Sequence, residues 1–308
     1  MALFVASALV APTSLDRGSL LAMLPFASVL AIAGIGQTLV VMQGGIDLSV
    51  AGAISLAVVI TTHEPHGENG LLLPALGLGF VVAMVAGGVN GVLVGRLGLN
   101  PIVATLGTNA LLYAGVLGIS GGSPRRTTDL LREVAGGLTW GVPNSIYVVV
   151  VVVVVVTVAV KLLVSGRRFE AIGANPAVGV ATALPVMRHR AGAYVWAQVL
   201  YWLAGVLLAG VIAQPTAFQG DAYLLPSVAA VVLGGTSLRG GRGYLVATAV
   251  AALFLSQLDQ FVLALGVSFA IRTLVEAAAL TVGVALYSLD WQDLRNRFLG
   301  RAPVAAAG

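Results

Sequence analysis

The sequence predicts an all-α integral membrane protein with about ten transmembrane helices. Hydrophobic residues make up 58% of the 308 residues, charged residues only 9%, and the mean hydropathy is +1.00. These values lie outside the range of soluble globular domains. The apolar runs are long enough for helices that cross ~30 Å of hydrocarbon, whereas barrel strands would be shorter and would alternate in polarity. We therefore expect one transmembrane domain, 1–308.

The amino-terminal part of the chain predicts a short helix followed by a broken one. Residues 1–14 are apolar but too few to span comfortably, and they lack the basic start of a signal peptide, so further sequence upstream is an open possibility. Leu20 to Gln43 is long enough for a second span. Two glycines then interrupt the helix, and Asp47 is placed to cap a new helix from Leu48 to about Thr62.

Three further spans are predicted before the middle of the chain. Residues 71–95 carry glycines at a spacing that lets membrane helices approach closely. Asn100 and Pro101 open a fifth helix, which a long loop at 120–143 follows. Residues 144–164 include nine consecutive valines, which favour a strand in water. In lipid a helix is expected instead, because a helix satisfies its own backbone hydrogen bonds.

A polar stretch, Gly166 to Arg190, separates the sixth span from the second half of the chain. Further apolar segments follow it, and a glycine-rich break comes after the eighth. These segments are 191–214, a short one at 223–233, 244–265 and 266–287, with a polar tail at 289–308.

The basic residues orient the bundle. With the amino terminus inside, eleven of the sixteen lie on the cytoplasmic side, as the positive-inside rule requires, and the polar stretch is cytoplasmic. Because these arginines stand at the ends of apolar segments, we attribute the net charge of +4 to topology and expect no nucleic-acid partner. The cytoplasmic set is Arg96, Lys161, Arg167, Arg168, Arg188, Arg190, Arg239, Arg242, Arg295, Arg297 and Arg301, and the outer set is Arg17, Arg125, Arg126 and Arg132.

Four segments resemble one protein family in their order and spacing. They read GGIDLSVAGAIS, GLNPIVATLGTNAL, GRRFEAIGANPAVGVATALPV and VAAVVLGGTSLRGGRG. From about Leu15 to Tyr287 the chain resembles the permease subunits of ribose-type sugar ABC importers. It departs from the family pattern at Ala51, which separates Val50 from Gly52, and in its short first helix.

The resemblance implies a multi-pass, type II ABC importer permease of the bacterial cytoplasmic (inner) membrane that translocates a monosaccharide or similar polyol. It implies a second permease subunit, identical or not, a cytoplasmic ATP-binding subunit and a periplasmic or lipid-anchored substrate-binding protein. It also places a coupling segment at Glu170 to Val186, within a coupling loop at 165–191. We expect membrane lipid around the bundle, ATP on the partner subunit, no cofactor on this chain and no enzymatic activity.

The residues themselves are consistent with an external motor. Lys161 is the only lysine and does not lie in a phosphate-binding loop motif, so the energy comes from a partner or a gradient. Residues 173–184 predict a short helix capped by Asn175, with Pro176 first, that presents small side chains to an ATPase groove. A helix lying on the membrane is the alternative, although aromatic anchors would suit it better. The expected coupling residues are Glu170, Gly173, Asn175, Pro176, Ala177, Val180 and Ala181.

Polar residues inside the apolar segments are candidates for a gate and a path. A carboxylate at Asp47 is costly in a membrane unless it is satisfied, so with Ser49 it either shapes an inner gate, contacts sugar hydroxyls, or serves only as an N-cap. The other polar residues in these segments either line a path for a neutral polyol or form hydrogen bonds between helices. The expected gate and path residues are Asp47, Ser49, Asn90, Thr105, Thr108, Asn109, Gly234 and Gly235, with Gln198 and Gln257 in the same polar class.

Four further patterns each allow two interpretations. The aromatic residues of 191–214 either stack on sugar or anchor the helix at the interface. Arg272 and Glu276, four residues apart, favour a structural pair over a proton relay. The acidic and histidine-rich loop at 63–70 is better explained as a solvated loop than as a metal site, so no metal is expected. In the outer loop, binding-protein docking by charge complementarity competes with simple solvation; the basic residues there are Arg125, Arg126 and Arg132.

Two other functional classes compete with the importer. A gradient-driven secondary transporter of a small polar solute would need buried carboxylates along its path, for which Asp47, Asp259 and Glu276 are candidates with structural explanations of their own. A membrane enzyme would need a clustered acid, base or metal set, and the sequence gives no sign of one. Thiolate metal sites and disulfides are excluded, because the chain contains no cysteine.

Overall fold

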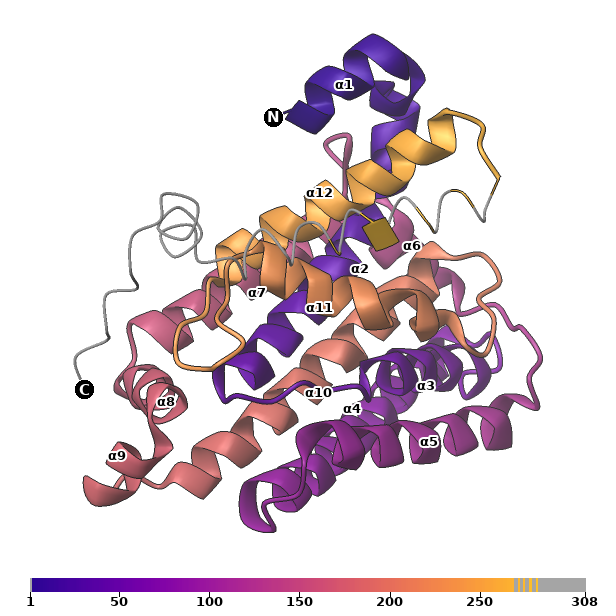
Figure 1. Ribbon diagram of the computed structural model, residues 1–308. Helices are drawn as coiled ribbons and strands as arrows, with labels where there is room; N and C mark the ends of the chain where they lie inside the picture. Colours follow the sequence, from indigo (N-terminus) through magenta and orange to yellow (C-terminus); the bar gives the residue numbers. More distant parts are fainter. Residues whose placement is uncertain (1, 269–270, 272–273, 275–276, 279–280, 282–308) are drawn as a thin grey trace, which may run out of the picture.

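The computed structural model describes residues 2–268 and the isolated positions 271, 274, 277, 278 and 281, and Figure 1 shows this part as a bundle of helices. One two-residue strand pair, β1 (Leu138–Thr139) with β2 (Val142–Pro143), interrupts the helices. The α-helices are α1 (Ala2–Val10), α2 (Arg17–Met42), α3 (Val50–His63), α4 (Leu72–Asn90), α5 (Pro101–Ser120), α6 (Asp129–Gly136), α7 (Asn144–Lys161), α8 (Val164–Ala174), α9 (Pro176–Ala181), α10 (Val186–Val211), α11 (Leu224–Leu233) and α12 (Leu245–Ala264). Shorter turns are η1 (Pro12–Leu15), η2 (Asn69–Leu71), the π-helical η3 (Gly91–Arg96) and η4 (Gln219–Tyr223).

Within the described residues, six helical stretches are long and apolar enough to cross a membrane. They are α2, the run Asn69–Arg96 around α4, α5, α7, α10 and α12, while α3 and Gln219–Leu233 are apolar but shorter. The predicted first helix is the nine-residue α1. Most of the predicted tenth span, including Arg272 and Glu276, and the polar tail lie outside the described residues. The chain is therefore an all-α, multi-pass membrane protein.

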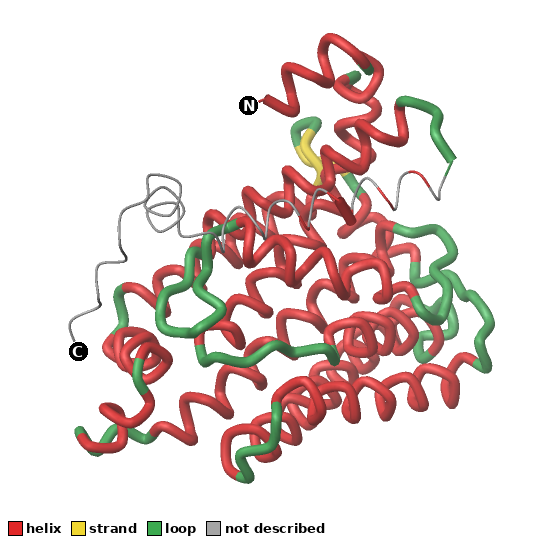
Figure 2. The backbone as a smooth tube through the Cα atoms, viewed as in Figure 1, coloured by secondary structure: helices red, strands yellow, loops and turns green. Residues whose placement is uncertain are grey.

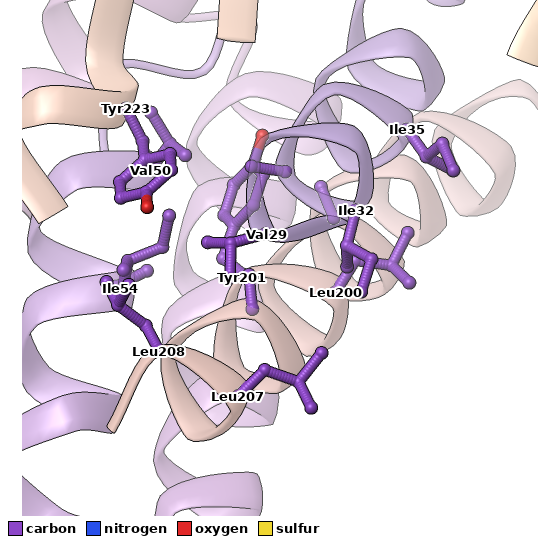
Figure 3. Close-up of a cluster of buried hydrophobic side chains, with 14 of the residues drawn as sticks. Val29, Ile32, Ile35, Val50, Ile54, Leu200, Tyr201, Leu207, Leu208 and Tyr223 are labelled. Carbon is purple, nitrogen blue, oxygen red and sulfur yellow. The ribbon is translucent and has the colours of Figure 1, made fainter. Parts of the chain in front are cut away.

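Helices α2 and α10 form the centre of the bundle. The most apolar window is 61% buried in α2 and 67% buried in α10, compared with 17% in α7. Figure 3 shows Ile32 of α2, Ile54 of α3 and Leu208 of α10 among the buried side chains that join these helices. The valine-rich α7 is helical, as predicted, and turns much of its surface outward.

Glycines allow the central helices to approach closely. A Cβ at Gly36 of α2 would stand 2.7 Å from the Tyr201 ring of α10, and one at Gly87 of α4 would stand 2.5 Å from the Val195 Cα of α10. The predicted packing role of the glycines in 71–95 is confirmed at Gly87, whereas Gly88 faces open space.

The loop expected at 120–143 contains a helix, α6, that was not predicted. Thr128 caps it, because its Oγ1 accepts a hydrogen bond from the Leu131 N–H at 3.3 Å. Leu131 and Ala135 are buried against the end of α10, where a Cβ at Gly210 would collide with Ala135. The apolar face of this eight-residue helix is too short to stand out among the surrounding polar residues.

The break after α2 has the predicted position but a different cap. Figure 2 shows an extended segment between α2 and α3, which end and begin at Met42 and Val50. The N-cap of α3 is Ser49, so the expectation that Asp47 caps this helix was wrong by two residues. Asp47 instead accepts hydrogen bonds from Ser49, which shapes the turn that leads into the helix.

Candidate functional site

Six of the eight predicted gate and path residues meet at the break between α2 and α3. Together with Gln198 they form one polar group that involves α3, α4, α5 and α10, and all of its members except the partly exposed Asn109 are buried. We call it the break cluster: Asp47, Ser49, Asn90, Thr105, Thr108, Asn109 and Gln198.

Ser49 is the centre of the break cluster. Its Oγ donates to Asp47 Oδ1 at 2.5 Å and accepts from Asn90 Nδ2 at 3.0 Å and from Gln198 Nε2 at 2.6 Å. The Ser49 N–H also donates to Asp47 Oδ1, at 2.9 Å. These four side chains are fully buried, so one hydroxyl joins the break to α4 and α10 without access to solvent.

Helix α5 satisfies the backbone of the break. The Leu48 N–H donates to Thr105 Oγ1 at 2.9 Å, and the Gly52 N–H donates to Asn109 Oδ1 at 2.8 Å. The first N–H groups of a helix lack intrahelical partners, so these side chains do for α3 what a cap would do. Thr108 Oγ1 extends the chain of bonds to Asn90 Oδ1 at 2.6 Å. For Thr105, Thr108 and Asn109, this geometry favours bonding between helices over the lining of a path.

The Asp47 carboxylate is satisfied by hydrogen-bond donors. Gln198 Nε2 reaches its second oxygen at 3.4 Å. In the described part of the chain the recorded ion pairs join Lys161 to Glu170 and Arg132 to Asp129, so neither involves Asp47. The start of α3 points its N–H groups toward this region, which favours negative charge. A negative charge on Asp47 is therefore stabilised by the hydrogen-bond donors around it and by the dipole of α3.

Gln37, a polar residue of α2 that faces the break, was not among the predicted site residues. With its amide oriented to suit both neighbours, its nitrogen donates to the Asp47 carbonyl and its oxygen accepts from the Asp47 N–H, each at 3.1 Å. Tyr201 of α10 lies 2.8 Å from the same amide. The sequence signal for this role was a single glutamine within the long apolar helix α2.

The aromatic residues of α10 are mainly structural. Tyr201 is fully buried among apolar side chains, as Figure 3 shows, and Tyr194 is almost as buried. Trp202 packs edge-on against Phe80 of α4, with ring centroids 5.4 Å apart. Trp196 is exposed on the outer surface of the helix. Stacking of a sugar on Tyr194 or Tyr201 is not possible in this arrangement.

The second glycine-rich break packs α11 against α12. A Cβ at Gly234 would stand 2.7 Å from the Thr248 N of α12, and Gly235 has a positive φ of 81°. These two glycines, expected at the gate, are therefore separate from the break cluster.

The polar stretch forms α8 and α9. Asn175 caps α9, since its Oδ1 accepts from the N–H groups of Ala177 and Val178 at 3.1 and 3.2 Å, and Pro176 takes the first position. Ala177, Val180 and Ala181 are exposed.

Two expected coupling residues make contacts with other helices of this chain. Gly173 is buried, and a Cβ there would collide with the Met42 carbonyl oxygen, so this residue packs against the end of α2 and is not part of the exposed face. Glu170 pairs with Lys161 of α7. Both residues therefore contact other helices of this chain.

Helix α8 contacts both glycine-rich breaks. The Gln43 Nε2 donates to the Phe169 carbonyl at 2.8 Å. The Met42 carbonyl accepts from the Gly241 N–H at 2.8 Å, next to Gly173. The chain between Gln43 and Asp47 is short, so α8 is mechanically connected to the break cluster.

The outer arginines differ in their surroundings. Arg125 and Arg126 are exposed, whereas Arg132 pairs with Asp129 at 3.2 Å.

In the acidic and histidine-rich loop, His63 Nδ1 lies 2.9 Å from Thr62 Oγ1. In the described ranges no three His, Asp or Glu side chains stand close enough to hold a metal ion.

Comparisons with known proteins agree with this architecture. Residues 19–296 match the family model described as branched-chain amino acid transport system / permease component. A probable ABC transporter permease protein, y4mJ, of Sinorhizobium fredii is 32% identical over 83% of this chain and 77% of its own. The ribose import permease protein RbsC of Bacillus subtilis is 31% identical over 89% of this chain and 86% of its own.

A third relative covers nearly the whole chain. The autoinducer 2 import system permease protein LsrD of Escherichia coli is 29% identical over 97% of this chain and 93% of its own. No solved structure matched. The family model, the relatives and the membrane-spanning helices together show that this chain belongs to the family of ABC importer permeases and is a multi-pass protein of the inner membrane.

Proposed function

We propose that this chain is the permease subunit of an ABC importer that moves a monosaccharide or a similar polyol, with ATP bound and hydrolysed by a separate cytoplasmic subunit. The observation that carries the proposal is the contact of α8 with the ends of both breaks, through Met42, Gln43 and Gly241. A force applied to the polar stretch would reach the segment that leads to Asp47. The relatives named for ribose and autoinducer 2 support a small, hydroxyl-rich substrate.

The finer architecture is part of the proposal. About ten membrane segments, in a type II arrangement, would comprise the six long spans, the short α3 and α11, α1, and the region 266–287. The whole chain, 1–308, would act as one domain. Its coupling loop would extend over 165–191, with α9 as the coupling helix.

The partners follow from the exposed surfaces. A groove on the ATP-binding subunit would receive α9 through Ala177, Val180 and Ala181, with Asn175 and Pro176 keeping the helix in shape. On the other side, the exposed Arg125 and Arg126 would attract acidic residues of a binding protein. Arg132 would contribute less, because Asp129 already pairs with it. A second permease subunit would complete the pathway.

ATP binding would then act by a shift between two states of the break. The side chains of the break cluster bond to one another or to the backbone at the start of α3, and all except the partly exposed Asn109 are buried, which supports a closed state of the break. Nucleotide binding to the partner would move α8 and α9, and α8 would move the end of α2. A ligand shifts such an equilibrium only by its difference in affinity for the two states.

The test is a substitution on the exposed face of α9. Val180 is 68% exposed, so Val180→Arg leaves the fold intact but places a long cation at the proposed interface. We expect hydrolysis stimulated by loaded binding protein to fall about tenfold in the purified complex. Val180→Thr, which keeps the branched shape at an exposed position, is the control and should stay within about twofold.

Two results would contradict the proposal. Unchanged stimulated hydrolysis in Val180→Arg would remove α9 from the coupling path. Uptake that survives ATP depletion and collapses with the proton gradient would favour a secondary transporter, in which the buried Asp47 would carry the proton.

A further inference from the structure

The turn η4, which directly precedes α11, lies beside the start of α3. The Gly220 N–H donates to Ser55 Oγ of α3 at 2.9 Å. A Cβ at Gly220 would collide with the Ala51 carbonyl oxygen, close to the start of the same helix. The chain thus returns into the bundle after α10, and η4 lies at the depth where α3 begins. Two short helices, α3 and α11, both start in this region.

Asp221 of η4 lies beside the middle part of α5 and not beside one of its ends. Its Oδ1 accepts a hydrogen bond from the Tyr113 hydroxyl. Tyr113 comes twelve residues after Pro101, so it lies about 18 Å along a helix that is about 30 Å long. With α5 spanning about 30 Å of hydrocarbon, this distance places the carboxylate within the core and not at the membrane surface.

Three side chains form an open patch here, which we call the η4 site: Tyr113, Phe218 and Asp221. Asp221 is exposed, Tyr113 is half-buried, and Phe218 is 40% exposed. The rings of Phe218 and Tyr113 meet edge-to-face, with centroids 5.2 Å apart and an interplanar angle of 82°. The patch contrasts with the break cluster, in which Asp47, Ser49, Asn90 and Gln198 are buried.

The exposure of Asp221 at this depth indicates a water-filled space. An aspartate facing the centre of the hydrocarbon core costs about 2.5–3.5 kcal/mol, and ionisable residues inside membranes accordingly face cavities or polar partners. The single hydrogen bond from Tyr113 leaves further acceptor positions on the carboxylate.

We propose that the η4 site binds the transported solute and that this solute is a neutral, polyhydroxylated molecule. The proposal deepens the function proposed above and rests on it. The carboxylate of Asp221 accepts from hydroxyl groups, the Tyr113 hydroxyl both donates and accepts, and the exposed part of the Phe218 ring suits the C–H face of a sugar. An anionic solute would be repelled by Asp221.

The first test asks whether water reaches the site. The chain contains no cysteine, so Phe218→Cys in the full-length protein, in membranes with its partners, carries a unique thiol. Thiols react as thiolates, which form in water and not in hydrocarbon. We expect a charged, membrane-impermeant thiol reagent to label Phe218→Cys at least about tenfold faster than Val151→Cys on the exposed surface of α7.

The second test asks what the site binds. D-ribose or glycerol at about 0.2 M should slow the labelling of Phe218→Cys about threefold, as expected for a site with a Kd of about 0.1 M, whereas glycine betaine, which has no hydroxyl, should not. Adding Asp221→Ala should abolish the protection, whereas adding Asp129→Ala on the outer helix α6 should preserve it.

The outcomes separate this proposal from the proposed function. Labelling no faster than that of Val151→Cys, equal protection by betaine, no protection by either polyol, or protection that survives Asp221→Ala would each overturn the η4 site. None of these readouts requires ATP, so failure of coupling in Val180→Arg would be a distinct result.

Discussion

The side chain of Gln198 on α10 lies 2.6 Å from the hydroxyl of Ser49, where its Nε2 donates to Ser49 Oγ. The two residues are 149 positions apart in the sequence and both are fully buried. Through this bond the central helix of the bundle holds the start of α3. The bond also makes the shape of the break sensitive to a residue far from it in the chain.

Gln198→Leu should therefore destabilise the protein. The leucine keeps most of the volume but removes the donor to Ser49 and to Asp47, which leaves buried acceptors less satisfied. Such a loss costs about 1–3 kcal/mol, so we expect a lower midpoint of thermal unfolding for the purified protein in detergent. Gln214→Leu, at an exposed position just beyond the same helix, is the matched control. Equal midpoints for the two variants would show that the buried bond contributes nothing.

Gly173→Ala should loosen α8 from the bundle. The added methyl group would collide with the Met42 carbonyl oxygen and would lie 3.0 Å from the Gly241 N. Overpacking of this kind costs about 1–3 kcal/mol. Limited proteolysis should therefore cut the polar stretch faster in this variant. Gly88→Ala of α4, whose Cβ would meet open space, should leave the cleavage rate unchanged. Wild-type resistance in Gly173→Ala would contradict the contact between α8 and α2.

The pair formed by Lys161 and Glu170 should contribute little stability. Both side chains are partly exposed, at 37% and 27%, so water and salt screen the attraction. In a double-mutant cycle with Lys161→Met and Glu170→Gln, we expect a coupling energy below about 1 kcal/mol that shrinks further at high salt. The cycle can be read from unfolding midpoints. A coupling of several kcal/mol would mean that the pair is shielded in the assembled transporter.

Regular features of the fold were predictable from the sequence. Long apolar runs predicted the main spans, and Asn100 and Asn175, each followed by proline, predicted helix starts that the structure confirms. These signals are local, because a cap or a span depends on neighbouring residues. The helix α6 escaped prediction, since its stability depends on burial of Leu131 and Ala135 against α10.

The site was predictable in its composition but not in its connections. Polar residues in apolar spans indicated most of the break cluster, yet their partners lie on four different helices. Gln37 and Gly173 show the limit most clearly. The role of Gln37 comes from the Asp47 backbone that faces it, and the role of Gly173 comes from the Met42 carbonyl next to it. Neither contact leaves a pattern in the sequence.

The membrane topology can be tested with single cysteines, because the native chain contains none. Helix α10 has 26 residues and is about 39 Å long, which is enough to place α9 and η4 at different depths of the bundle. The arginine distribution predicts that α9 lies inside the cell and the β1–β2 turn outside. In intact cells, an impermeant thiol reagent should therefore label Trp140→Cys, which replaces a side chain that is 92% exposed in that turn. Ala177→Cys on α9 should react only after the membrane is permeabilised. The reverse pattern would place the polar stretch outside the cell, beyond the reach of any cytoplasmic ATP-binding subunit.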